Sequence, residues 1–93
     1  MMFYLICYDI ADDKRRNKIA SILEGYGSRV QFSVFECVLS GKQYQQLQQK
    51  LKKIFKKEED SLRFYCISRH TLNNIEVWGV NSEITEAFSS VIV

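Results

Sequence analysis

The sequence predicts an α+β domain in which two helices cover one face of a four-stranded sheet. Four short runs rich in aromatic and β-branched residues have the length of strands, and two longer segments repeat apolar residues at helical spacing. Their order along the chain is β-α-β-β-α-β, which is typical of the ferredoxin-like fold. A last apolar run adds strand material at the C-terminus. We expect a single domain over residues 1–93, because a chain of this length holds one compact core.

The first strand is expected over residues 3–8, FYLICY, a continuous apolar run. A helix then begins near Asp12 or Asp13, either of which can cap the free amides of its first turn. Gly25 and Gly27 are expected to end this helix. Its buried side is predicted to consist of Ile19, Ile22, Leu23 and Tyr26.

A hairpin and the second helix are expected next. Residues 29–39, RVQFSVFECVL, are predicted to form two strands joined by a tight turn at Phe32 and Ser33. Ser40, followed three residues later by Gln43, has the spacing of a capping box and starts the second helix. The apolar side of that helix is predicted to carry Tyr44, Leu47, Leu51, Ile54 and Phe55.

The C-terminal third is predicted to be extended, with strands at 62–67 and 88–93 and a further extended segment at 75–80. Two helices cover only one face of a sheet, yet residues 3–8 offer apolar side chains to both faces. An apolar second face would be an unusual exposed patch on a monomer. We therefore expect a homodimer formed through the sheet, with residues 81–93 pairing with the partner protomer. The alternative is that the last strand joins its own sheet.

The composition is that of an ordinary globular protein, with 46% hydrophobic and 26% charged residues. No apolar run approaches the roughly 20 residues of a membrane helix, so a cytoplasmic location is expected. The net charge of +2 does not by itself indicate a polyanionic partner. Three cysteines, without the paired spacing of a zinc site, are expected to be reduced core thiols: Cys7, Cys37 and Cys66.

Asp9 stands where the first apolar strand ends and the chain turns toward a helix. The first turn of that helix carries Lys14, Arg15 and Arg16, with Lys18 close behind, although cations there oppose the helix dipole. An acid able to hold Mg²⁺ beside several cations is what phosphodiester chemistry requires. The alternatives are an aspartate that satisfies turn amides and a solvated basic face. A second basic cluster is expected to contact phosphates and consists of Lys50, Lys52, Lys53, Lys56 and Lys57.

Three segments together resemble one known family. They are YDI at 8–10, DDKRRNK at 12–18 and RVQFSVFEC at 29–37. In this combination they resemble the CRISPR-associated protein 2 family, the small partner of the spacer integrase. The resemblance runs from about Met2 to Gly79, most of the chain.

The resemblance implies roles for individual residues. Asp9 matches the metal-binding catalytic acid, and Tyr8 matches a position that affects nuclease activity. Arg16, Arg29 and Phe35 match positions that affect activity or contact nucleic acid. The basic first turn adds Arg15 and Lys18 to the expected nucleic-acid contacts, although Lys18 replaces an arginine of some relatives and loses bidentate phosphate binding. Ser33 is expected to be structural, with a supporting role near the site.

The function implied is that of a Mg²⁺-dependent endonuclease on RNA or double-stranded DNA, whose dimer bridges integrase subunits during spacer acquisition. One acid per chain gives Mg²⁺ few protein ligands, so catalysis would need two Asp9 side chains meeting across the two-fold axis of a dimer. The alternatives are a non-catalytic nucleic-acid-binding scaffold and a toxin-type ribonuclease of similar fold. An RNA-recognition motif is disfavoured, because VFECVL lacks the glycine- and aromatic-rich motif of its third strand.

Overall fold

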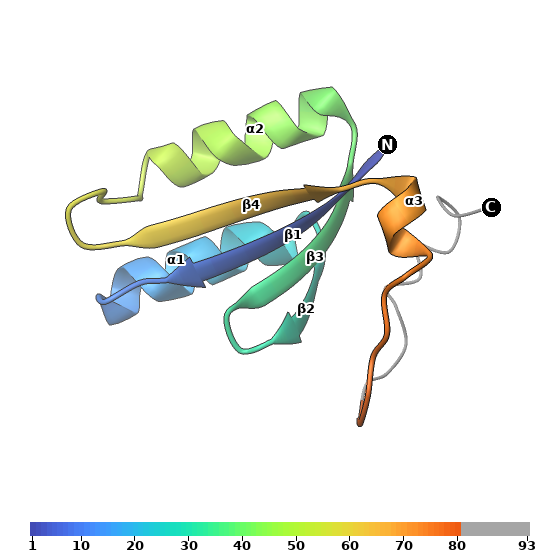
Figure 1. Cartoon of the computed structure of the whole chain (residues 1–93). Helices are drawn as coiled ribbons and strands as arrows, with labels where there is room; N and C mark the ends of the chain where they lie inside the picture. Colours follow the sequence, from blue (N-terminus) through green and yellow to red (C-terminus); the bar gives the residue numbers. More distant parts are fainter. Residues whose placement is uncertain (81–93) are drawn as a thin grey trace.

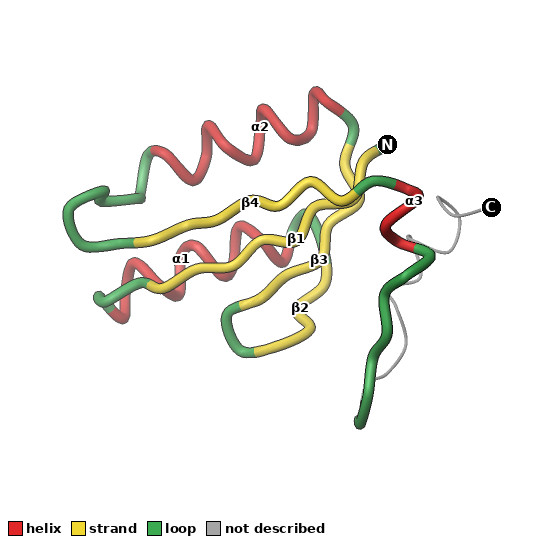
Figure 2. Tube along the Cα trace, viewed as in Figure 1, coloured by secondary structure: helices red, strands yellow, loops and turns green. Residues whose placement is uncertain are grey.

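The computed structural model describes residues 1–80, and the expected pairing of residues 81–93 with a partner lies outside the described part. The elements, shown in Figures 1 and 2, are β1 (Met2–Asp9), α1 (Asp13–Glu24), β2 (Ser28–Gln31), β3 (Val34–Leu39), α2 (Gly41–Lys52), β4 (Ser61–Ile67) and α3 (Arg69–Leu72). The predicted order β-α-β-β-α-β is confirmed over β1 to β4. The hairpin turn lies at residues 32 and 33, as predicted.

The four strands form one antiparallel sheet in the order β2-β3-β1-β4. β1 is central and pairs with β3 on one side and β4 on the other; Leu5, for example, lies opposite Glu36 and Tyr65. Both long helices pack on the face to which Tyr4 and Ile6 point, where they share one apolar core with the sheet. The molecule is therefore a two-layer α+β structure.

Local capping explains where the two long helices begin. The Asp12 carboxylate accepts a hydrogen bond from the Arg15 backbone amide at 2.8 Å, so α1 starts at the expected place. Ser40 and Gln43 form the predicted capping box of α2, with bonds of 3.2 and 2.9 Å. α2 ends at Lys52, however, so the assignment of Ile54 and Phe55 to that helix was wrong. Ile54 reaches the core from the loop that follows.

Gly27 lies where α1 gives way to β2 and passes very close to β3. A Cβ atom at this position would lie 2.3 Å from the Glu36 carbonyl oxygen and 2.4 Å from Cys37 Sγ. Gly25 caps α1 with an ordinary helical φ of −75°. The two glycines therefore differ in degree. A Cβ at Gly27 would overlap β3, whereas a Cβ at Gly25 would make only a tight contact of 3.3 Å with the Ile22 carbonyl oxygen.

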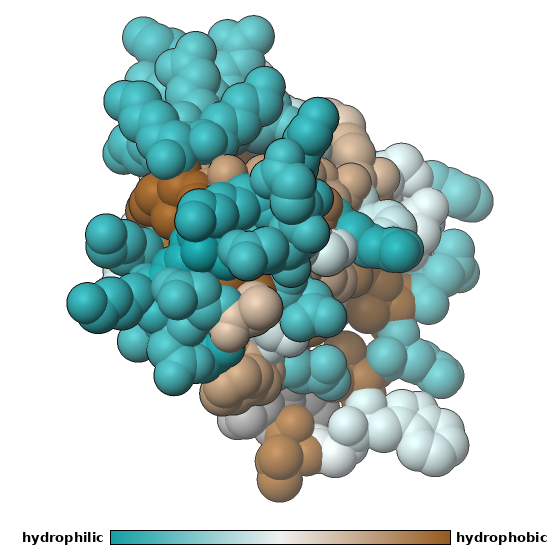
Figure 3. Space-filling view, turned by 90° about the vertical axis from the view of Figure 1, so that its left-hand side faces the viewer, coloured by the Kyte–Doolittle hydropathy of each residue, from teal (hydrophilic) through white to brown (hydrophobic). Residues whose placement is uncertain are grey.

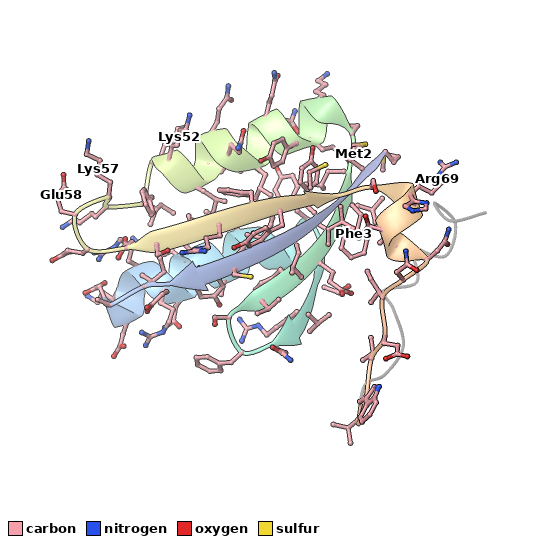
Figure 4. The ribbon with its side chains drawn as sticks, in the orientation of Figure 1. Met2, Phe3, Lys52, Lys57, Glu58 and Arg69 are labelled. Atoms are coloured by element: carbon pink, nitrogen blue, oxygen red, sulfur yellow. The ribbon has the colours of Figure 1, made fainter. Side chains whose placement is uncertain are left out.

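The second face of the sheet is partly covered by the chain itself. Phe3 and Leu72 form a small buried cluster there, with Leu5, Val38, Ile67 and Ile75 packed around them. Figure 4 shows Phe3 on the side where α3 lies. The short helix α3 was not predicted, and residues 75–80, expected to be extended, form no strand in the structure. The chain therefore covers one end of the apolar face itself. The homodimer through this face stays a prediction.

The cysteines differ from one another. Cys37 is buried, Cys7 is half-buried and Cys66 is exposed on β4, so the expectation of core thiols is wrong for Cys66. Burial raises the pKa of Cys37 to about 11, which keeps this thiol protonated at neutral pH. Among residues 1–80, no helix is both long enough and apolar enough to cross a membrane.

Candidate nucleic-acid and metal site

Asp9 is the last residue of the central strand, and its side chain is exposed. It lies opposite Ser61, the first residue of β4. The β2–β3 turn reaches the same end of the sheet, because the Tyr8 amide donates to the Ser33 carbonyl oxygen at 3.1 Å. Figure 3 views the molecule from this end and shows mainly hydrophilic residues. A carboxylate here is open to solvent, as the predicted role of Asp9 requires.

Tyr8 is buried beneath this end of the sheet and holds the hairpin turn. Its hydroxyl donates to the Phe32 carbonyl oxygen at 3.4 Å, and its ring lies 6.2 Å from that of Phe35. The hydroxyl is therefore engaged with the backbone. A direct part of Tyr8 in catalysis stays a prediction, whereas its contact with the turn is a feature of the fold. Ser33 takes part through its backbone carbonyl, in line with the structural role expected of it.

Arg16 and Lys18 remain close to solvent. One guanidinium nitrogen of Arg16 donates to the Ile10 carbonyl oxygen at 3.0 Å, and another pairs with Asp13. Arg16 thereby braces the residue that follows Asp9. Lys18 is exposed and borders a shallow pocket between α1 and Ile54, which lies in the loop after α2. Phosphate binding by both cations stays a prediction.

Arg15 has a different environment from its neighbour, since its side chain is only 10% exposed. Its guanidinium donates to both carboxylate oxygens of Asp60, at 2.6 and 2.9 Å, and reaches Glu59 at 3.0 Å. The hydrogen bond from Arg15 is the main reason that the pKa of Asp60 lies below its usual range. These contacts favour a structural role for Arg15 over the predicted contact with nucleic acid.

Asp60 was missed by the sequence analysis. It lies in a polar segment before β4 and is separated from Arg15 by 45 positions. Nothing in the local sequence distinguishes it from Glu58 or Glu59. Only the packing of the loop before β4 against the first turn of α1 brings this pair together.

Arg29 and Phe35 form one unit on the hairpin. The Arg29 guanidinium lies 5.3 Å from the centre of the Phe35 ring and pairs with Glu24 at 3.3 Å. Phe35 itself is 0% exposed. This burial argues against the predicted contact of Phe35 with nucleic acid, because a fully buried ring cannot touch a ligand. The ring instead lies against Arg29, which is exposed.

The sequence profile of a known family, described as CRISPR associated protein Cas2, matches residues 2–75. The chain belongs to the Cas2 family. A curated relative from Synechocystis sp., named CRISPR-associated endoribonuclease Cas2 3, is 55% identical, and the match covers 100% of both chains.

Two solved structures agree with the architecture described above. A hypothetical protein from Thermus thermophilus is 37% identical with a TM-score of 0.78, and the match covers 91% of this chain and 98% of that one. A chain of a partial Cas6-RT-Cas1–Cas2 complex is 37% identical with a TM-score of 0.73, covering 89% of this chain and 88% of its own. Both structural matches cover most of the fold. Family membership itself rests on the sequence matches.

The described part of this Cas2-family chain supplies few metal ligands. Within residues 1–80, no group of three or more histidine, cysteine, aspartate or glutamate side chains is placed to hold an ion. Asp9 offers an exposed carboxylate, a ligand type that suits Mg²⁺, which commonly binds through one or two carboxylates and several waters. The residues therefore fit Mg²⁺ when a second carboxylate or the substrate completes the site.

The lysine cluster of the sequence lies on and after α2. Figure 4 shows Lys52 and Lys57 pointing outward on the α2 side of the molecule. Lys50 lies 5.0 Å from the centre of the Tyr26 ring. Their contact with phosphate stays a prediction, although their exposure is compatible with it.

Proposed function

We propose that this chain acts as a homodimeric, Mg²⁺-dependent endonuclease on RNA or double-stranded DNA within CRISPR adaptation. The observation that carries the proposal is the exposed Asp9 carboxylate at the end of the central strand, with Arg16 bracing the next residue. Relatives of this chain are named as endoribonucleases and endonucleases, and these names support the proposed nuclease activity. We assign the β-α-β-β-α-β order and the strand order to the ferredoxin-like class.

In this proposal each residue has a limited task. Asp9 of each protomer binds the ion across the two-fold axis. A bound Mg²⁺ supplies an activated water and neutralises charge on the phosphate. Arg16 fixes the backbone beyond Asp9, and Lys18 and Arg29 hold phosphates of the substrate. Tyr8 and Phe35 keep the hairpin in place from beneath.

The integrase subunit is the proposed protein partner. A chain similar to this one forms part of a Cas6-RT-Cas1–Cas2 complex, which supports association with Cas1.

A second candidate function follows from the single exposed carboxylate at the end of β1. A chain that needs a partner to complete its metal site can also serve as a non-catalytic scaffold that bridges integrase subunits.

Asp9→Asn tests the proposal, because it keeps the shape of the side chain and removes its charge. The variant is expected to lose at least 100-fold in kcat with Mg²⁺, as residues that act at the reacting atoms do, and to remain a dimer. Cleavage of single-stranded RNA and of duplex DNA is measured beside reconstituted spacer integration with Cas1. Undiminished cleavage would refute the role of Asp9. Lost cleavage with intact integration would identify the scaffold as the cellular task.

A further inference from the structure

Asp60 is a buried carboxylate held by hydrogen bonds from two separate segments. Its side chain is 0% exposed. Arg15 donates to both oxygens, and the Lys56 amide donates to Oδ2 at 3.0 Å. These bonds use most of the roughly four acceptor positions that a carboxylate offers. Such a group has a defined position and cannot turn without losing hydrogen bonds.

The main donor comes from the connection that follows Asp9. Arg15 belongs to the first turn of α1, which begins at Asp13. Ser61, the residue after Asp60, lies opposite Asp9 in the β1–β4 ladder. The Asp60 carboxylate therefore joins the connection that leaves Asp9 to the strand that flanks it.

Stability alone is a poor explanation of this arrangement. A buried ion pair loses hydration on folding, and that loss offsets much of its attraction. Arg15 also stands in the first turn of a helix, where a cation is disfavoured by the helix dipole. A fixed geometry is the clearer consequence, because a bidentate guanidinium pair restrains both direction and distance.

We propose that Asp60, through Arg15, is a positioning residue that fixes the β1–α1 connection and thereby the carboxylate of Asp9. The inference rests on the proposed function of Asp9. Asp60 touches neither substrate nor metal in this scheme. Groups that orient a metal-binding residue from behind typically contribute roughly 10–100-fold to activity or metal affinity.

Three variants separate this role from general stabilisation. Asp60→Asn keeps the shape but replaces one acceptor oxygen with an NH₂ donor, so it cannot accept from the guanidinium through two atoms. Arg15→Lys keeps the charge but loses the two-pronged guanidinium geometry. Glu59→Gln is the matched control, since Glu59 reaches the same guanidinium at 3.0 Å but is 56% exposed. Each variant is compared with wild type for dimer mass, for Mg²⁺-dependent cleavage of single-stranded RNA and duplex DNA, and for exchange of the Arg16 amide, which donates to the Asp12 carbonyl oxygen at 2.8 Å.

Asp60→Asn is expected to lower kcat roughly 10–100-fold with little change in KM, and to speed exchange of the Arg16 amide. Arg15→Lys should show the same changes to a smaller degree, which keeps the test valid if Asp60→Asn fails to fold. Glu59→Gln should match wild type. Wild-type kcat in both Asp60→Asn and Arg15→Lys would overturn the proposal, as would equal losses in Glu59→Gln.

The exchange measurement does not depend on nuclease activity. If wild type and Asp9→Asn cleave equally, or neither cleaves, the proposed function fails. Exchange of the Arg16 amide then decides the positioning alone: faster exchange in Asp60→Asn supports it, and unchanged exchange refutes it.

Discussion

Neighbouring arginines in the first turn of α1 have unlike surroundings. Arg15 is enclosed by two acids from the segment before β4, whereas Arg16 reaches back to the Ile10 carbonyl and stays partly exposed. Their local sequence is the same basic run, so only the tertiary contact distinguishes them. Of the two, Arg16 is the one still able to meet a phosphate.

The low pKa of Asp60 predicts a pH-dependent stability. A carboxylate whose pKa is lower in the folded state stabilises the fold above its unfolded pKa, and this contribution is lost as pH falls through the folded pKa. Wild type should therefore lose more stability than Asp60→Asn as pH falls from about 5 to about 2. Urea unfolding midpoints at a series of pH values measure this difference. Parallel pH profiles for the two proteins would contradict it.

Helix starts and strands were predictable because their causes are local. Ser40 and Gln43 satisfy the amides of their own helix, and Asp12 does the same for α1. The end of α2 was not predictable: Ile54 continues the apolar spacing of the helix, yet it reaches the core from a loop. α3 was missed because a helix of four residues has no period to detect.

The junction of α1 and β2 depends on a missing side chain. Gly27→Ala places a Cβ against the backbone of β3, so we expect a loss of about 1–3 kcal/mol in the free energy of unfolding. Gly41→Ala is the matched control, because a Cβ at Gly41 meets nothing within 4 Å and alanine favours helix. Chemical denaturation compares the two. Equal stability of both variants would show that β3 shifts to accommodate the new Cβ atom without a loss in the free energy of unfolding.

The site residues were only partly predictable, because contacts between residues far apart in the chain leave no pattern in the local sequence. The strand-end acid Asp9 and the exposed Lys18 could be identified from sequence because their exposure follows from the local pattern. The burial of Phe35 follows from its place on the inner face of β3, under the helices. The partner of Arg15 is 45 residues away, and no local pattern points to it.

At the scale of the whole molecule, the C-terminal residues are predicted to hold the dimer together. Removing residues 81–93, which include the apolar Phe88, Val91, Ile92 and Val93, should weaken self-association. Sedimentation velocity over a range of concentrations, with the full chain as reference, measures the change. A truncated protein that dimerises with the same affinity would assign the tail to another contact, such as the integrase.

The central place of β1 has a consequence for biosynthesis. β1 needs neighbours on both sides and leaves the ribosome before either of them, because β3 and β4 follow only at residues 34–39 and 61–67. Until β4 emerges, β1 has one edge without a hydrogen-bonding partner. The sheet is thus expected to stay incomplete until residue 67 has been translated and released, and the slow step of folding is closure of the long loop between β1 and β4.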